Sequence, residues 1–167
     1  KYWDAIAGNY FASNEERRAF EVQKAMYLNG MLTTEDEIMR IVNFYNRFNV
    51  PYQGAKILEK EMNAGRISKN LDHLELLANL YQVAREHEKA IPVIRAAADA
   101  GGGGAMYERL GRSYADLQKW KEAEDALQKA LSLGGVKDPG TAWVQIGQSR
   151  YERDDRAGAR EAFRKGN

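Results

Sequence analysis

The segment that most constrains the fold runs from Gly104 to Lys137, where apolar residues recur at helical spacing on both sides of a polar turn at residues 117–119. Each side is expected to form a short amphipathic helix. Large and small residues alternate across the two facing stripes, as two closely packed antiparallel helices require. The stripes consist of Tyr107, Leu110, Gly111 and Tyr114 in the first helix and Ala123, Leu127 and Ala130 in the second. The segment therefore predicts a helix–turn–helix hairpin.

The same spacing recurs along the whole chain. The first residue of the stripe in each first helix, which we call the signature position, is Trp3, Ile38, Leu74, Tyr107 and Trp143 in the five units. Successive gaps are therefore about 35, 36, 33 and 36 residues. A fixed period of this length is typical of solenoids, in which each unit buries its apolar face against its neighbours. Five units fill the 167 residues, at about 1–33, 34–70, 71–103, 104–139 and 140–167. We therefore expect one all-α domain over residues 1–167, with no room for a separate catalytic domain.

The residue order of the fourth unit resembles the tetratricopeptide repeat. The family's signature aromatic, Leu, Gly, Tyr, Ala, bulky and Ala residues correspond here to Tyr107, Leu110, Gly111, Tyr114, Ala123, Leu127 and Ala130. Gly135 stands where the family usually has proline. The resemblance implies a right-handed superhelical solenoid of about five helix-turn-helix repeats. It does not define a function, because repeats of this kind bind many unrelated partners.

Three local signals refine this prediction. Thr34 followed by Glu37 is a capping box, which predicts the start of a helix. Pro92 falls inside the second helix of the third unit, or in its first turn if that helix starts late, and is expected to bend or delay it. The glycine run from Gly101 to Gly104 predicts a hinge-like connection into the fourth unit.

The resemblance also implies a binding surface, because in tetratricopeptide proteins the first helices line a concave groove. The residues at groove-facing positions are Met39, Asn43, Asn46, Arg47, Glu75, Asn79, Gln82, Glu108, Arg112, Gln148 and Tyr151. Equivalent positions in successive units hold Asn43, Asn79, Arg112 and Gln148, which we call the polar ladder. Such groups can bind the backbone of an extended peptide. We therefore expect the groove to bind a peptide or protein segment; the competing interpretation is a solvated polar face.

Two other binding modes are weaker. A carboxylate clamp needs clustered basic residues in adjacent units, but only Arg47 and Arg112 qualify and acidic residues interrupt them. A nucleic-acid surface would rely on the arginines between Arg150 and Arg164. Acidic residues are interleaved with these arginines, which favours i, i+3 and i, i+4 pairing on a solvated face. The net charge of +1 gives no further support for nucleic acid.

Nothing in the sequence favours catalysis, a metal or a cofactor. There is no cysteine, and the two histidines, His73 and His87, lack metal-binding spacing. The glycine run lacks the Lys-Ser/Thr of a phosphate-binding loop and follows a predicted helix rather than a strand. We predict a non-enzymatic interaction scaffold without cofactor or metal.

From about Leu32 onward the chain resembles a narrower group, the bacterial repeat proteins encoded beside TonB, ExbB and ExbD components. The shared features are a Pro-Tyr turn at 51–52, an Ala-Ile-Pro second helix at 90–92 and a Pro-Gly helix start at 139–140. The resemblance implies a periplasmic protein with a TonB, ExbB or ExbD partner. A cytoplasmic location is the alternative.

The two ends suggest a second mode of assembly. The chain begins with Lys1 rather than Met and ends with the fifth helix pair, so we expect a fragment of a longer protein. Solenoids need polar caps over their terminal apolar faces. Self-association through uncapped ends or through the outer face is therefore the alternative to groove binding. No apolar run reaches 18 residues, which predicts no membrane span.

Overall fold

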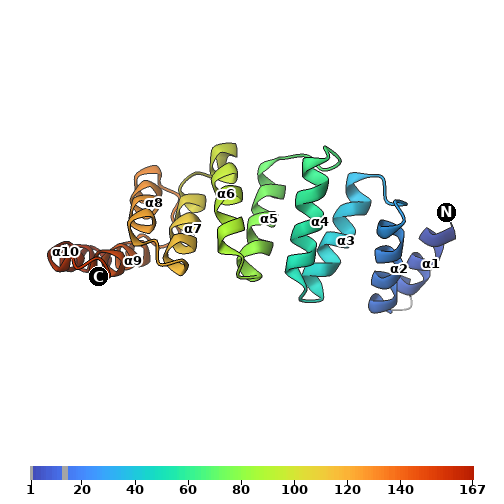
Figure 1. Cartoon of the computed structure of the whole chain (residues 1–167), viewed down its shortest axis with the longest axis horizontal. Coiled ribbons are helices and arrows are strands. Elements are labelled where there is room, and N and C mark those ends of the chain that lie inside the picture. Colours follow the sequence, from blue (N-terminus) through green and yellow to red (C-terminus); the bar gives the residue numbers. More distant parts are fainter. Residues whose placement is uncertain (1, 13–14) are drawn as a thin grey trace. The chain divides into compact units, whose positions relative to one another are not determined.

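A computed structural model describes residues 2–12 and 15–167, and these residues form α-helices joined by short turns (Figure 1). Two compact units, Lys1–Ser68 and Lys69–Asn167, divide the chain. The all-α class is confirmed: the described residues contain no β-strand. The single domain over residues 1–167 stays a prediction.

Unit 1 contains two helix hairpins. Its helices are α1 (Tyr2–Ala12), α2 (Glu16–Leu28), α3 (Glu35–Arg47) and α4 (Pro51–Asn63). The capping box predicted at the start of α3 is confirmed. The Glu37 backbone N–H donates to Thr34 Oγ1 at 3.4 Å, and the Glu37 carboxylate accepts from the Thr34 N–H at 3.0 Å. Hydrogen bonds from the Thr34 and Thr33 amides lower the pKa of Glu37, because they favour the charged carboxylate.

The core of unit 1 joins aliphatic and aromatic residues from successive helices. The predicted stripe residues Ile38, Ile41 and Val42 of α3 are fully buried, as are Ala55 and Leu58 of α4. Beside them lies a cluster of rings. Phe20 of α2 stacks on Phe48 at 5.1 Å and meets Tyr45 edge-on at 5.0 Å, and Phe44 stacks on Phe48 at 6.1 Å. This packing joins α2 to α3. Because one side of α3 is buried in it, the opposite side, which carries Asn43 and Asn46, faces solvent.

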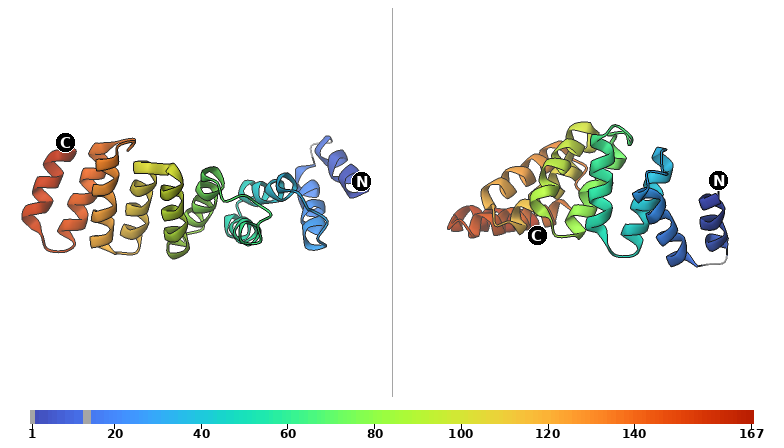
Figure 2. Two further views of the ribbon diagram at one scale, coloured as in Figure 1. Left: turned by 90° about the horizontal axis from the view of Figure 1, so that it is seen from above. Right: turned by 45° about the vertical axis from the view of Figure 1, so that its right-hand side comes forward.

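Unit 2 contains three helix hairpins, which lie side by side in chain order in Figure 1 and in the left view of Figure 2. Its helices are α5 (Leu71–Val83), α6 (His87–Ala97), α7 (Gly103–Asp116), α8 (Trp120–Leu133), α9 (Pro139–Tyr151) and α10 (Arg156–Gly166). Close contacts join α5 to α6, α6 to α7, α7 to α8, α8 to α9 and α9 to α10. Each hairpin thus packs on the next within this unit.

The two irregular features that the sequence indicated for unit 2 lie within and directly after α6. Pro92 lies inside α6, which starts at His87 and continues to Ala97. The chain then kinks at Ala98–Gly102, where Gly101 has a φ of 113°. A side chain would be strained at this φ, so glycine is the residue that fits. The predicted hinge-like connection is thus a kink between α6 and α7.

Candidate functional site

The polar ladder is exposed on the first helix of each hairpin from the second to the fifth. Asn43 lies on α3 in unit 1, and Asn79, Arg112 and Gln148 lie on α5, α7 and α9 in unit 2. Within the described residues, no protein group hydrogen-bonds the side-chain amides of Asn43, Asn79 and Gln148. An exposed amide without an internal partner keeps both its donors and its acceptor available to a ligand.

Gln82, another predicted groove residue, is engaged inside unit 2. Gln82 Oε1 accepts hydrogen bonds from Arg109 Nη2 at 2.6 Å and Nε at 3.1 Å, and Gln82 Nε2 donates to Ser113 Oγ at 2.9 Å. These bonds join α5 to α7. Burial lowers the pKa of the Arg109 guanidinium, although the Glu75 carboxylate acts in the opposite direction. Gln82 therefore serves the packing of α5 on α7.

This engagement gives a testable expectation for Gln82. The Gln82→Leu variant should lose about 2 kcal/mol of unfolding free energy, because the half-buried Arg109 guanidinium loses the acceptor of two charge-assisted hydrogen bonds. Chemical denaturation followed by circular dichroism measures the loss. Asn79→Leu, three residues earlier on α5, is the matched control and should change stability by less than about 0.5 kcal/mol. Equal effects of the two substitutions would contradict a structural role for Gln82.

The remaining predicted residues differ in accessibility. Glu108 is 5% exposed and its carboxylate accepts from the Arg112 guanidinium four residues on, while Arg47 Nη1 lies 2.7 Å from Glu16 Oε1 in an exposed ion pair. Met39 and Glu75 are half-buried, and Asn46 and Tyr151 are exposed. The Arg156 guanidinium lies 5.7 Å from the centre of the Tyr151 ring. Glu108 is therefore a buried counter-ion for Arg112 rather than an exposed ligand-binding group.

Two recesses adjoin the ladder, one in each unit. On α3 a recess of about 300 Å³ is lined by Arg40, Asn43, Phe44 and Arg47. Between α7, α8 and α9 a recess of about 410 Å³, which we call the α7–α9 recess, is lined by Arg112, Ala115, Asp116, Trp120, Gln145, Gln148 and Ser149. Each recess thus contains at least one predicted groove residue, and the second brings Arg112 and Gln148 of the ladder to the same cavity.

Among the residues that line these recesses, the sequence analysis missed Arg40 and Gln145. Each comes two residues after the signature position of its first helix, at Ile38 and Trp143 respectively; Arg109 holds the same position on α7 but is engaged by Gln82. The family resemblance did not supply this position as groove-facing. Aligning the first helices on the signature residues would have found it, because polar residues recur there in three of the five units.

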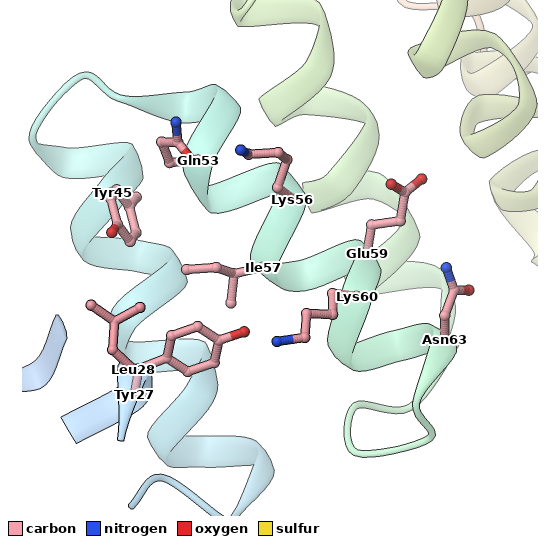
Figure 3. A pocket seen from close by; sticks show the side chains of 9 residues that line it. All are labelled: Tyr27, Leu28, Tyr45, Gln53, Lys56, Ile57, Glu59, Lys60 and Asn63. Carbon is pink, nitrogen blue, oxygen red and sulfur yellow. The ribbon is translucent and has the colours of Figure 1, made fainter. Parts of the chain in front are cut away.

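A further groove lies on the second helices of unit 1. It has a volume of about 500 Å³ and is lined by Tyr27, Leu28, Tyr45, Gln53, Lys56, Ile57, Glu59, Lys60 and Asn63. Figure 3 shows Tyr27 and Leu28 from α2 opposite Ile57 and Lys60 from α4. Leu28 is 73% exposed. This groove therefore combines an accessible apolar patch with two lysines, and we call it the α2–α4 groove.

Two arginines of the last hairpin pair with a residue of the preceding hairpin, whereas the sequence predicted i, i+3 and i, i+4 pairs with neighbours on the same helix. Arg150 Nε lies 2.8 Å from Glu124 Oε1, and Arg153 Nη1 lies 2.6 Å from Glu124 Oε2. Glu124 is a buried residue of α8, so these pairs join the second helix of one hairpin to the next hairpin. Sequence spacing alone could not have found contacts between residues 26 and 29 positions apart.

In the described part of the chain, no cluster of three or more His, Asp or Glu side chains could hold a metal ion. None of the helices described is both long and apolar enough to cross a membrane.

Among the comparisons with known proteins, the solved structures show what fold this chain has. No family model matches the chain, and no curated protein sequence does either. Among solved structures it is similar to a crystal structure of MamA protein, with a TM-score of 0.71 and 17% identity over 99% of this chain and 88% of that one. MamA MSR-1 gives a TM-score of 0.73 and 18% identity over 99% and 93%. MamA from Desulfovibrio magneticus RS-1 gives a TM-score of 0.69 and 15% sequence identity, over 99% of this chain and 91% of that one.

These similarities establish the kind of fold. MamA is a helical-repeat protein of the tetratricopeptide type, so the predicted all-α fold of helix-turn-helix repeats is confirmed. At sequence identities of 15–18%, the similarity shows the fold alone. The function must therefore be argued from the surfaces of this chain.

Proposed function

We propose that this protein is a non-enzymatic interaction scaffold that binds a peptide or protein segment along its first helices. The observation that carries the proposal is the set of exposed amides in the polar ladder, Asn43 on α3 in unit 1 and Asn79 and Gln148 on α5 and α9 in unit 2, which have no internal hydrogen-bond partner among the described residues. An extended peptide presents N–H and C=O groups at regular intervals, and amide side chains can pair with both. The recesses beside the ladder would then accept side chains of the bound segment.

A TonB-type system supplies the proposed partner. The Pro-Tyr turn at 51–52, the Ala-Ile-Pro helix at 90–92 and the Pro-Gly helix start at 139–140 support this choice, because they resemble the repeat proteins encoded with TonB, ExbB and ExbD. The proposal places the protein in the periplasm and assigns it the role of an adaptor for a segment of one of those components. A cytoplasmic adaptor with another partner is the alternative.

Calorimetric titration with the periplasmic domain of a TonB-type protein from the same organism tests the proposal. The informative variant replaces Asn43, Asn79 and Gln148 together by Ala. Each of these side chains is exposed and has no internal partner in the described part of the chain, so their removal should leave the fold intact. Arg112 is kept, because its loss would leave the buried Glu108 carboxylate without its counter-ion. We expect saturable binding by the parent chain and a loss of at least about tenfold in affinity for the variant.

The matched control replaces three exposed residues on second helices, Gln53, Glu88 and Arg160, by Ala. It removes the same number of polar side chains without changing the net charge, and it should bind like the parent. Equal binding by all three proteins would move the site away from the first helices. The absence of binding by the parent would overturn the TonB assignment.

Self-assembly through the outer face is the second candidate function. The α2–α4 groove favours it, because exposed Leu28 lies beside half-buried Ile57 and Tyr27 on the second helices. Molar mass measured by light scattering separates the two functions. A mass that rises with protein concentration, equally for the parent and the ladder variant, would support assembly through the outer face or the ends. Nucleic-acid binding is a weaker alternative, since Arg150 and Arg153 are committed to Glu124.

A further inference from the structure

The α2–α4 groove of unit 1 has an accessible apolar side. Leu28, the last residue of α2, is 73% exposed, and Tyr27 and Ile57 beside it are half-buried. Figure 3 shows Tyr27 and Leu28 on one side of the groove and Ile57 of α4 opposite them. An exposed apolar patch rimmed by polar side chains is typical of a surface that binds another protein.

Two ammonium groups face the same groove. Figure 3 shows Lys56 and Lys60 extending from α4 toward α2 and α3, whereas the Glu59 carboxylate projects from the other side of α4. Lys56 Nζ lies 5.3 Å from the centre of the Tyr52 ring. Lys60 Nζ lies 5.5 Å from the centre of the Tyr27 ring. A ring positions an ammonium group over its face and leaves N–H donors for a carboxylate.

The protein itself neutralises these lysines incompletely. Within the described residues no carboxylate pairs with Lys56. Lys60 Nζ lies 3.9 Å from Glu61 Oε1, which is longer than a charge-assisted hydrogen bond. The buried Glu61 carboxylate already accepts from Tyr27 and from Arg66. The groove side of α4 therefore carries excess positive charge beside the apolar patch, and a segment with apolar and acidic side chains complements both.

We propose that the α2–α4 groove is a second docking site, for a partner segment that presents large apolar side chains next to acidic ones. The apolar side chains would pack against Leu28, Ile57 and the Tyr27 ring, and the carboxylates would accept from Lys56 and Lys60. The lining comes mainly from α2 and α4, whereas the ladder residue of this unit lies on α3 and lines a different recess. Such a site goes beyond the proposed function, because it lets one scaffold hold two segments.

A second copy of the chain is the competing occupant of the groove. A twofold contact between two such grooves would place the same surface on both copies. It would therefore bring the ammonium groups of Lys56 and Lys60 from both copies into one interface. Like charges in one interface oppose association. Charge thus favours a different, acidic partner over self-association at this groove.

Peptides of the form acetyl-Gly-Leu-X-X-Leu-Gly-amide, with X as Glu, Gln or Lys, test the site without a natural partner. A fourth peptide keeps both Glu residues and has Ala in place of each Leu. Binding is followed by nuclear magnetic resonance at the methyl groups of Leu28 and Ile57 in low salt. We expect the Glu peptide to shift both signals and to bind about fivefold more tightly than the Gln peptide. The Lys and Ala peptides should bind more weakly than either.

Salt and three variants connect this preference to the groove. Raising the salt to about 0.5 M should remove most of the difference between the Glu and Gln peptides, because exposed charges are screened. Lys56→Met should reduce the same difference by about half. Leu28→Ser should weaken every Leu-containing peptide about threefold or more, and it should fold normally because Leu28 is exposed. Lys129→Met is the matched control. It removes the same charge from α8 in unit 2, where Lys129 Nζ lies 4.2 Å from the centre of the Tyr107 ring, and it should change neither result.

The other outcomes overturn the docking site. Equal binding of the Glu and Gln peptides, or tighter binding of the Lys peptide, would contradict the acidic partner. If no peptide moved the Leu28 signal at millimolar concentration, the groove would not be a docking site. A molar mass that rises with concentration for the parent, but not for Leu28→Ser, would assign the groove to a second copy. The titration with the TonB-type domain decides the proposed function separately, because its ladder variant leaves the residues of the α2–α4 groove unchanged.

Discussion

Replacing Gly104 by Ala should destabilise unit 2 by about 3 kcal/mol, which is at the upper end of the usual cost of adding a methyl group to a fully packed site. Gly104 is buried in the first turn of α7. A Cβ atom there would lie 1.9 Å from the carbonyl oxygen of Gly134 and 2.7 Å from that of Ala130. Both obstacles belong to the backbone at the end of α8, so no side chain can move aside. The two helices would have to separate.

Thermal unfolding followed by circular dichroism measures this effect, and we expect the midpoint of unit 2 to fall by roughly 15 °C. Gly8→Ala is the matched control, because a Cβ atom at Gly8 of α1 would meet nothing within 4 Å. Alanine is the better helix former, so this control should gain up to about 1 kcal/mol. A Gly104→Ala protein as stable as the parent would show that α7 and α8 do not need their close approach.

Replacing Glu61 by Gln should destabilise unit 1 by about 2 kcal/mol at neutral pH. Glu61 of α4 is fully buried, and its two carboxylate oxygens accept from different donors. Tyr27 Oη donates to Oε1 at 2.7 Å, and the Arg66 guanidinium donates to Oε2. A glutamine side chain offers only one acceptor oxygen, and its amide nitrogen would face a donor. Chemical denaturation at pH 7 measures the loss.

The same contacts predict how this loss depends on pH. Burial by itself raises the pKa of Glu61. The Tyr27 hydroxyl and the Arg66 guanidinium together lower it by more than burial raises it, so the folded-state pKa lies below its ordinary value. Burial and the bond to Glu61 raise the pKa of Tyr27. The contribution of Glu61 is therefore fully present above the unfolded-state pKa of about 4.3 and is lost as the pH falls through the lowered folded-state value.

The parent chain and the Glu61→Gln protein should accordingly become more similar in stability between neutral pH and about pH 3. Glu21→Gln is the matched control in unit 1, because Glu21 is exposed and lies 3.7 Å from Lys24 Nζ in a weak surface pair. Its effect should stay within about 0.5 kcal/mol at every pH. A constant difference between the parent and Glu61→Gln down to pH 3 would contradict the assignment of a charged, stabilising Glu61.

The sequence by itself determined the hairpins and much of their packing. The stripe residues Ile38, Leu58, Leu110 and Leu127 are buried as expected, because helical spacing fixes which side chains share a face. The start of α3 could be predicted from Thr34 and Glu37 for the same reason, since a capping box is a contact between residues three positions apart. The family resemblance also indicated the exposed amides of the polar ladder.

Only the tertiary structure decided which polar residues are free to bind a ligand. Gln82 and Glu108 occupy predicted groove positions, yet Arg109 and Arg112 engage them. Arg150 pairs with Glu124 of the preceding hairpin instead of a neighbour on its own helix. Position within a repeat determines the direction of a side chain, but not whether another helix brings a partner to it.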